Sequence, residues 1–433
     1  MKLPTLLFAV LLMPISGAFA ENDALRDLFS NGKLDAWNGA GYVLNEGVLT
    51  TTEKSEMLVS KALYTRYVLD FDFKLPAEGS YTLVLHYAGQ GDPQKSGVAI
   101  PLLGATANAA AAPTQAHGSI AGLVAPVSPA LKPAGEWNHQ RITVMESTIA
   151  VELNGAMISR ANLNDLSAKQ PDHLGLKQRA GQIVFLGRGS EASFRNVKIH
   201  EMVPAANTAG VTEAGFKPLF DGKSLQGWVH DPATTHEWFA QDGALKHTGK
   251  LGEPRNLWTK KTYGDFTMVF DWRWSHRGNI MPQPIIESNG KIKLDEKGEP
   301  QRIEVEEQDS GIFIRGNEKS QVNLWNWSVG SGEIYGYRHE DSTPDEVRAA
   351  CTPKLRADQP TGVWNRMMIQ AKGNRVSVSL NGRVVIEGAD LSEMPARGPI
   401  GIQHHGQALE FSNVWIREES TPSTTDSATH DNP

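Results

Sequence analysis

Hydrophobic and polar residues alternate in short runs along most of the chain. In FTMVFDWRW, residues 266–274, core-side apolar residues occupy every second position from Phe266 to Trp274. A period of two predicts a β-strand with one side in a core. Similar runs recur between clusters of Gly, Asn, Asp and Pro, which favours many short antiparallel strands. A helical period occurs only around residues 25–29 and 345–350.

Five segments of the first half return in the same order in the second half. The pairs are LFSNGKLDAW and LFDGKSLQGW, YVLDFDFKL and FTMVFDWRW, PAGEWNHQRITV and PTGVWNRMMIQ, VELNGAMI and VSLNGRVV, and ASFRNVKIHE and LEFSNVWIRE. A conserved order of this kind indicates tandem duplication. The LNG of the fourth pair, at Asn154-Gly155 and Asn381-Gly382, predicts a two-residue hairpin turn in each copy.

Each copy is therefore predicted to be an all-β sandwich or jelly roll. The first domain is expected over residues 24–203 and the second over residues 215–418. Residues 204–214, rich in Ala, Gly and Thr, are expected to form a linker. The polar tail, residues 419–433, has the composition of a disordered segment.

The N-terminus and the composition narrow the class of protein. Residues 1–20 combine a lysine, an apolar run and the small residues Ala18 and Ala20, which predicts a Sec signal peptide and export to the periplasm or beyond. An uncleaved membrane anchor is disfavoured because the apolar run is short for a span. A net charge of −7 without a basic run argues against nucleic acid or a membrane surface as partner. The single cysteine, Cys351, excludes an intrachain disulfide framework and a cysteine-based zinc cluster.

The second copy gathers polar and aromatic residues on one predicted sheet face. In DSGIFIRG, residues 309–316, Ile312 and Ile314 take the core side, which leaves Asp309 and Arg315 for the opposite side. By the same alternation this face receives Asp271, Arg273, Gln321, Asn323, Trp325, Trp327, Gln403 and His405. Indoles stack on sugar rings and planar polar groups bind hydroxyls, so the face favours a saccharide site. A solvated polar face, with Asp271 and Arg273 paired across strands, is the alternative.

Two further segments carry candidate chemistry. The run RIEVEEQD places Glu304 and Glu306 before Asp309, which offers paired carboxylates for a glycosidase or simply a solvated acidic run. The glycine-rich loop GSGEIYGYR supplies Glu333, Tyr335 and Tyr337. The sequence contains no HExxH, P-loop, nucleophile elbow or close His/Asp ligand set. No cofactor is required by these motifs; a divalent metal such as calcium is compatible with loop oxygens but not specified.

The same face is absent from the first copy. Where the second copy has SQVNLWNW, the first has SGVAIPLL, and His86 replaces Arg315. Nine of the eleven tryptophans follow the linker, which concentrates the expected binding face in the second copy. We therefore expect the second copy to carry the activity, and the first to be a structural or ancillary partner.

These motifs resemble a known family. FTMVFDWRW, DSGIFIRG, SQVNLWNWSVGSGEIYGYR, the LNG hairpin and GPIGIQHHG are similar to the DUF1080, or 3-keto-disaccharide hydrolase, domain. The resemblance spans residues 216–418 and continues more weakly, in register, through the first copy. It implies two tandem concanavalin/LamG-like β-sandwich (jelly-roll) domains, similar to laminarinase-type glycosidases, in an exported protein that degrades glycans.

The resemblance also implies an unusual route of glycosidic cleavage. A partner oxidoreductase would first oxidise the C3 hydroxyl of the sugar to a ketone. A base would then remove the acidified C2 proton, the C1 substituent would leave, and water would add. On this reading, His405 or Glu333 is the base and Arg315 stabilises the enolate. The hydroxyl ligands are Asp309, Gln321 and Asn323, and the stacking platform is Trp325.

Two other functions fit the same residues. A non-catalytic carbohydrate-binding protein would use the same indole and amide face. A conventional laminarinase-like hydrolase would use Glu304 or Glu306. Substituting both glutamates separates the hydrolase from the elimination route, which does not need them.

Overall fold

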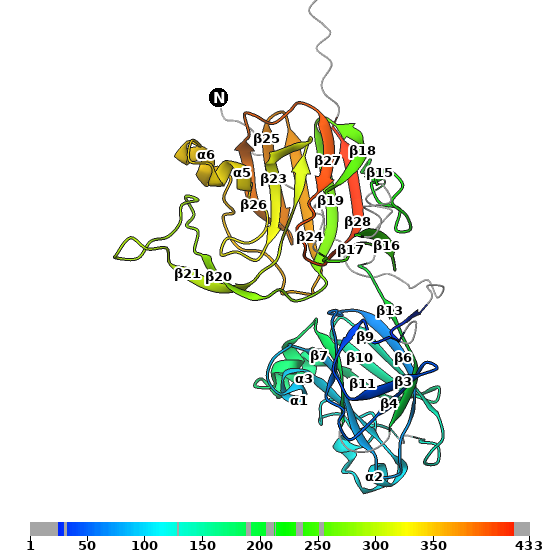
Figure 1. The fold of residues 1–433 in the computed structure, drawn as a ribbon. Coiled ribbons are helices and arrows are strands. Elements are labelled where there is room, and N and C mark those ends of the chain that lie inside the picture. Colours follow the sequence, from blue (N-terminus) through cyan, green and yellow to red (C-terminus); the bar gives the residue numbers. More distant parts are fainter. Residues whose placement is uncertain are drawn as a thin grey trace, which may run out of the picture.

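The computed structural model of the chain describes residues 25–29, 33–127, 130–187, 192–204, 212, 214–230, 237–250 and 255–419. It contains two β-sandwiches, one for each sequence repeat, joined near residue 204 (Figure 1). The predicted signal peptide, most of the predicted linker and nearly all of the predicted tail lie outside the described residues. No helix in the described part of the chain is long and apolar enough to cross a membrane.

The first sandwich packs an eight-stranded sheet against a five-stranded one. The eight-stranded sheet has the order β11(Ala156–Asn162)-β10(Thr148–Leu153)-β9(Asn138–Met145)-β6(Tyr67–Lys74)-β13(Ser193–Glu201)-β4(Val48–Thr51)-β3(Tyr42–Asn45), with β1(Arg26–Asp27) also paired to β13. The five-stranded sheet has the order β2(Trp37–Asn38)-β5(Leu58–Ser60)-β12(Gln182–Gly187)-β7(Ser80–Tyr87)-β8(Val98–Leu103). Its helices are α1(Pro93–Ser96), α2(Ala105–Ala110), η2(Pro113–Gln115), α3(Leu163–Lys169) and η3(Leu174–Lys177).

The second sandwich repeats this topology strand for strand. Its eight-stranded sheet has the order β16(Trp238–Gln241)-β17(Ala244–His247)-β28(Leu409–Glu418)-β19(Phe266–Trp274)-β24(Asn365–Lys372)-β25(Arg375–Leu380)-β26(Arg383–Asp390), with β14(Lys217–Pro218) paired to β28. Its five-stranded sheet has the order β15(Trp228–Val229)-β18(Leu257–Tyr263)-β27(Gly398–Ile402)-β22(Asp309–Ile314)-β23(Asn317–Trp325). A separate hairpin, β20(Ile280–Pro284)-β21(Arg302–Glu306), and the helices α5(Tyr335–His339) and α6(Asp345–Ala350) complete it.

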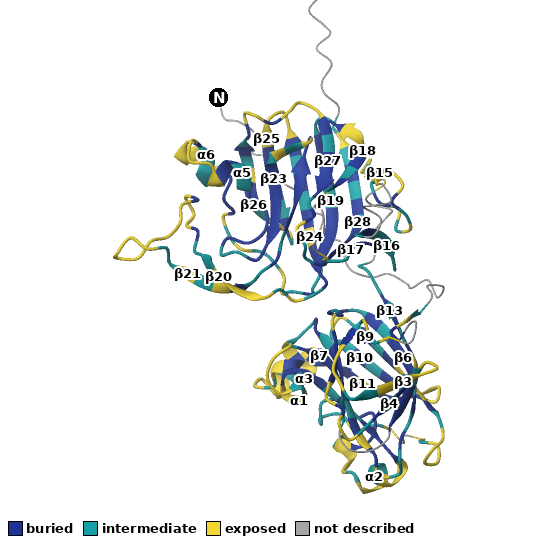
Figure 2. Cartoon of the chain, viewed as in Figure 1, coloured by how far each residue is buried: buried dark blue, intermediate teal, exposed yellow. Residues whose placement is uncertain are grey.

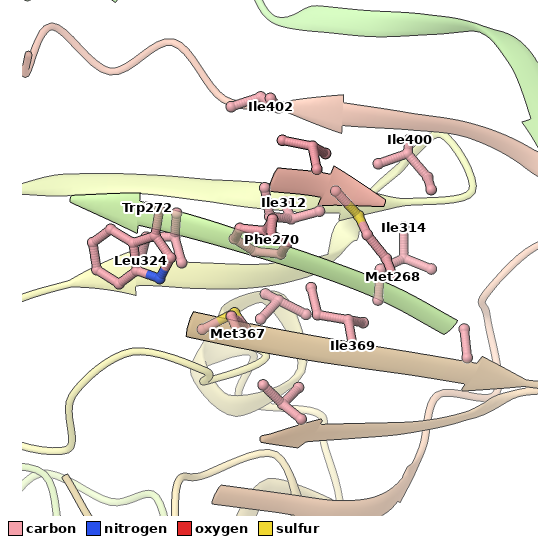
Figure 3. Packing of buried hydrophobic residues seen from close by; sticks show 14 of the residues in the cluster. Met268, Phe270, Trp272, Ile312, Ile314, Leu324, Met367, Ile369, Ile400 and Ile402 are labelled. Atoms are coloured by element: carbon pink, nitrogen blue, oxygen red, sulfur yellow. The ribbon is translucent and has the colours of Figure 1, made fainter. Parts of the chain in front are cut away.

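The apolar residues that the period of two predicts to point inward form the core of the second sandwich. Met268, Phe270 and Trp272 of β19 meet Ile312 and other inward residues of the five-stranded sheet (Figure 3). Strand residues of the second sandwich are largely buried, whereas exposed residues gather in loops and along the β20–β21 hairpin (Figure 2). The all-β sandwich expected for each copy is confirmed.

Local turn chemistry also matches the sequence. Asn154-Gly155 joins β10 to β11 and Asn381-Gly382 joins β25 to β26, with positive φ at all four residues. These are the dihedrals of the type I′ turn, which matches the twist of the flanking strands. The helix expected at residues 345–350 is α6, but the one expected at residues 25–29 is wrong. That segment forms β1 instead, because pairing with β13 satisfies its backbone better than one unsupported helical turn.

The two sandwiches meet at a buried cluster of charges. The Arg273 guanidinium donates to Glu410 of its own sheet at 2.7 and 2.9 Å and forms an ion pair with Glu201 of the first copy. Lys246 Nζ lies 3.3 Å from a carboxylate oxygen of each glutamate. All four of these residues are buried. A backbone bond from Leu63 N to Ser275 O, 2.8 Å long, continues the contact between the copies.

Candidate active site

The outer face of the five-stranded sheet in the second copy brings together the central part of the predicted site. Asp309 is paired with Trp325, Gly311 with Asn323, and Phe313 with Gln321, so alternate residues of β22 and β23 share one face. On the other side of β22, Gln403 N donates to Gly311 O at 2.8 Å. The expectation that Asp309, Gln321, Asn323, Trp325 and Gln403 share a face is therefore confirmed.

Two glycines shape this face. A Cβ at Gly311 would lie 2.2 Å from Gln321 Nε2, and one at Gly401 would lie 2.6 Å from the Trp258 ring. The side chains of Gln321 and Trp258 therefore lie across the strands where the glycines stand. Gln321 Nε2 donates to Gln403 Oε1, which directs the Gln403 amide nitrogen away from this bond.

Most of the face is covered, although the sequence predicted a saccharide site on it. Gln321, Asn323 and Trp325 are all less than 8% exposed. Trp325 stacks on Trp327 with ring centroids 4.1 Å apart and packs in an apolar cluster with Ile286. The Trp325 indole also donates to Gly330 O at 3.0 Å, so its polar atom is already satisfied. The exposed stacking platform expected at Trp325 is wrong, because the loop after β20 and the loop after β23 bury it.

The accessible part of the face lies at its edge, around Asp309. The Asp309 side chain is 29% exposed and lies 3.8 Å from Nε2 of His405, which is 49% exposed. Burial raises the pKa of Asp309 to about 6, although His405 opposes this rise. A carboxylate with a pKa just below neutral is ionised at pH 7 and still basic enough to take a proton.

A second carboxyl lies beneath the first. Glu333 is paired beside Asn323 through the backbone bonds Asn323 N to Glu333 O and Gly332 N to Asn323 O, both 2.8 Å. Its side chain is fully buried and contacts the Arg338 guanidinium. Burial raises the pKa of Glu333 to about 8, against the pull of Arg338, and the negative charge of Asp309 adds to the rise. Glu333 is inaccessible from the outer face, and burial favours its protonated form, which argues against its expected role as the base.

Arg315 does not lie at this site. Its guanidinium donates to three backbone carbonyls, of Gly264, Gly373 and Pro395, at 2.6–3.1 Å, and to Asp265 Oδ1 at 2.8 Å. The residue has a positive φ of 53° and is 2% exposed. With its donors committed to the fold, Arg315 has no means of stabilising an enolate on the outer face. This expectation is wrong because the left-handed backbone turns the side chain away from its neighbours in β22.

Asp271 and Arg273 lie in the other sheet, so their expected place on the saccharide face is also wrong. Asp271 accepts from Arg366 at 2.8 Å through both oxygens and from Asn413 Nδ2 at 2.7 Å. This is the cross-strand pairing named as the alternative, although the partner of Asp271 is Arg366 on β24. Arg273 belongs to the charge cluster between the copies.

The remaining aromatic candidates take structural positions around the site. Tyr337 is 3% exposed, and its hydroxyl accepts from Glu393 N at 3.1 Å. Tyr335 packs edge-on against Trp325 with centroids 5.6 Å apart and is half-buried, as is Trp327. Of the aromatic residues that the sequence singled out, Tyr335 and Trp327 therefore combine partial exposure with a place beside the outer face.

The acidic run before β22 leaves the sandwich altogether. Glu304 and Glu306 lie on the β20–β21 hairpin and line a cavity of about 530 Å³ between the copies, together with Arg179 of the first copy. They share no sheet with Asp309, so the pair expected for a laminarinase-like hydrolase is not formed on one face.

The first copy keeps the framework and fills the face with apolar residues. Val84 stands in the strand position of Phe313, and with Val59 and Val184 it forms a buried cluster on the outer side of the five-stranded sheet. His86, in the position of Arg315, shares its positive φ, 54° against 53°. The loss of the polar face predicted from the sequence is confirmed.

The family is identified by its sequence match. The 3-keto-alpha-glucoside-1,2-lyase-like domain, also known as the 3-keto-disaccharide hydrolase domain, matches residues 24–200 and again residues 215–417. The chain belongs to this family. Its two matches are the two copies, and they place both among carbohydrate-active domains of the family. A search of curated proteins found no match.

Solved structures similar to the chain each correspond to about one copy. A protein provisionally named as a glycosyl hydrolase from Parabacteroides distasonis is 24% identical, covers 42% of this chain and all of its own, and has a TM-score of 0.38. The laminarinase from Rhodothermus marinus is 11% identical over 41% of this chain and 93% of its own, with a TM-score of 0.28. The carbohydrate-binding module CBM66 from Bacillus subtilis is 11% identical over 38% and 94%, with a TM-score of 0.25. Because these sequence identities and TM-scores are low, the chain is identified by its family match and not by these structures.

Sequence reasoning missed two residues of this 3-keto-disaccharide hydrolase domain. Trp258 of β18 stacks on Phe313 with centroids 5.4 Å apart, lies over Gly401 and is partly exposed. Arg338 contacts Glu333 from α5. The alternation of LWTKKTY could have placed Trp258 outward, but nothing local indicated that β18 lies next to β27. Arg338 is the last residue of the loop sequence GSGEIYGYR, which was already a candidate. Its side chain reaches Glu333 because residues 335–339 form helix α5.

Proposed function

We infer that this protein is an exported enzyme that cleaves 3-keto-glycosides by elimination followed by hydration, and that Asp309 is its base. Family membership supports the substrate class. The observation that carries the assignment is the carboxyl of Asp309, partly exposed at the edge of the outer face, with its pKa raised to about 6 and His405 3.8 Å away. The C3 ketone would be supplied by an oxidoreductase acting on the sugar beforehand.

The chemistry needs one base and one donor to the ketone oxygen. Asp309 takes the C2 proton, and the electrons of that C–H bond form the C2–C3 enolate. The enolate collapses by breaking the C1–O bond, and the leaving oxygen takes a proton. Water then adds across C1 and C2, so the net reaction is hydrolysis. A positioned base contributes a factor of about 10²–10⁴ to such a proton transfer.

The neighbours of Asp309 fit the remaining roles. Because Gln321 holds the carbonyl oxygen of the Gln403 amide, the Gln403 Nε2 group is the donor we assign to the ketone oxygen. His405, half-exposed beside Asp309, is suited to return the proton to the leaving oxygen. Trp258 lies on β18, which is separated from β22 by β27, and its partly exposed ring offers an apolar surface for a sugar ring.

The test is product release from paired substrates. The mature protein is incubated with a 3-keto-glucoside carrying a chromogenic leaving group and, separately, with the unoxidised glucoside. Release from the keto substrate alone, lost in Asp309→Asn and retained in the Glu304→Gln/Glu306→Gln double variant, supports the proposal. Release from both substrates, lost in the double variant, would instead indicate a conventional hydrolase.

Release from neither substrate, with saturable sugar binding by calorimetry, would make the protein a carbohydrate-binding module. The burial of Trp325 removes the platform expected from the sequence, so such a module would have to bind sugar through Trp258. Export is tested separately by fractionating cells of the source organism and sequencing the N-terminus of the mature protein.

A further inference from the structure

Away from the outer face, three segments distant in sequence bring two imidazoles and a carboxylate together. Glu237 precedes β16, His247 ends β17, and His404 follows β27. The pairing of Trp238 with His247 and the bond from Thr248 N to Glu237 O, 3.0 Å long, fix the first two residues side by side. One ligand atom from each of the three residues lies within 4.8 Å of the others.

The imidazoles are buried with nitrogens that have no partner. His247 is 2% exposed and His404 4%. Nδ1 and Nε2 of His404 and Nε2 of His247 have no hydrogen-bond partner among the described residues. Burying a polar nitrogen without a hydrogen-bond partner is destabilising. The rings meet edge to face with centroids 4.5 Å apart, which brings their bare nitrogens into one small space.

The surrounding contacts orient these groups as ligands. His247 Nδ1 lies 3.0 Å from Gln407 O and 3.2 Å from Gly249 N. We assign the proton to Nδ1, because the bond to the carbonyl is the shorter, and this leaves the Nε2 lone pair free. Thr248 Oγ1 donates to one carboxylate oxygen of Glu237, which is the outer-shell bond expected for a carboxylate ligand.

The first copy provides an internal comparison. Thr51, which pairs with Tyr42, occupies the strand position that His247 has in the second copy, where it pairs with Trp238. Gly187, which pairs with Tyr81, occupies the position of His404. There the Tyr81 ring fills the space, since a Cβ at Gly187 would lie 1.9 Å from it, and its hydroxyl lies 3.1 Å from Thr51 Oγ1. The same position in the fold is thus satisfied by protein atoms in one copy and left with bare imidazoles in the other.

We propose that Glu237, His247 and His404 form a binding site for a late first-row divalent cation such as Zn²⁺. Two imidazoles and a carboxylate suit this class, whereas calcium takes oxygen ligands. Two ligands ~2.1 Å from a tetrahedral ion lie ~3.4 Å apart, so small side-chain rotations close the site. Thr248, Gly249 and Gln407, which contact Glu237 or His247, also line a neighbouring cavity of about 240 Å³, and we assign the entry path to it.

The test uses the full mature chain, stripped with chelator and titrated with Zn²⁺ by calorimetry and with Co²⁺ by visible absorption. We expect one equivalent per chain, with affinity lowered at least about tenfold in His404→Gln and in Glu237→Gln. His139→Gln is the matched control, because His139 is an exposed histidine of the first copy. Zinc should raise the unfolding temperature of the unaltered protein and of the control, but not of the ligand variants.

Two results would overturn this metal site. One is the absence of stoichiometric binding; the other is unchanged affinity in both Glu237→Gln and His404→Gln. Far-UV circular dichroism checks that each variant folds, and Glu237, which is only half-buried, decides the question if His404→Gln does not fold. Metal binding is measured without substrate, so the result is independent of the proposed elimination chemistry.

Discussion

Replacing Arg273 should weaken the second sandwich and its contact with the first. The cluster contains three cations, Arg26, Lys246 and Arg273, and three carboxylates, Glu201, Asp242 and Glu410. Arg273→Met keeps much of the side-chain volume but leaves the two buried glutamates with Lys246 between them and with Arg26 beside Glu201 alone. Burial by itself opposes ionisation, yet Lys246, Arg273 and Arg26 together hold the pKa of Glu201 well below its ordinary value.

The size of the effect follows from burial. Removing one partner of a buried ion pair costs about 3–5 kcal/mol, because the other charge is left without compensation. Lys246 remains 3.3 Å from both glutamates and Arg26 remains 3.3 Å from Glu201, so we expect the lower end, about 3 kcal/mol. Because the pKa of Glu201 is lowered, this stabilisation is present above its unfolded pKa and is lost as the pH falls through the folded value.

The assay is unfolding in guanidinium chloride, monitored by tryptophan fluorescence. This signal reports mainly on the second sandwich, because nine of the eleven tryptophans follow the linker. With a slope of about 3–4 kcal/mol/M, the midpoint should fall by roughly 0.8–1 M. Arg397→Met is the matched control: its partner is Glu418, the Arg397 side chain is 55% exposed, and its loss should cost at most about 1 kcal/mol. Equal shifts in the two variants would refute the importance of the buried cluster.

Four further changes test the site and its supports. Asp309→Asn should abolish release from the 3-keto-glucoside, and in the unaltered protein kcat/KM should fall about tenfold per pH unit below a pKa of about 6; a flat profile would rule out Asp309 as the base. Arg315→Ala should lower the free energy of unfolding by about 3 kcal/mol or more, because three carbonyls and Asp265 lose their donor, whereas a stable but inactive variant would return this residue to the chemistry. Gly311→Ala should raise KM and cost about 1–3 kcal/mol in thermal unfolding, since its Cβ would lie 2.2 Å from Gln321; an unchanged KM would show that this part of the face does not bind substrate. The unaltered protein should lose stability as the pH rises from about 4.5 to about 8, because folded Glu333 keeps a proton that the unfolded chain releases; Glu333→Gln should remove that slope in urea titrations.

The sequence by itself determined the duplication, the strand content and the side of each strand that enters the core. These are local properties: a period of two depends only on neighbouring residues, and Asn-Gly, with φ of 51° at each Asn and of 85° and 78° at the Gly residues, selects its turn without help from distant parts. The apolar residues of β19 and β22 consequently lie where the alternation placed them.

The tertiary structure decided which strands share a sheet and what covers them. Alternation correctly put Asp271 and Asp309 on outward sides, but of different sheets, because strand order depends on pairings between distant segments. A single positive φ withdrew Arg315 from the face, and two loops buried Trp325. Contacts across such separations also assembled Glu237, His247 and His404, which no spacing in the sequence connects. Local pattern therefore fixed the strands, while long-range packing fixed the sites.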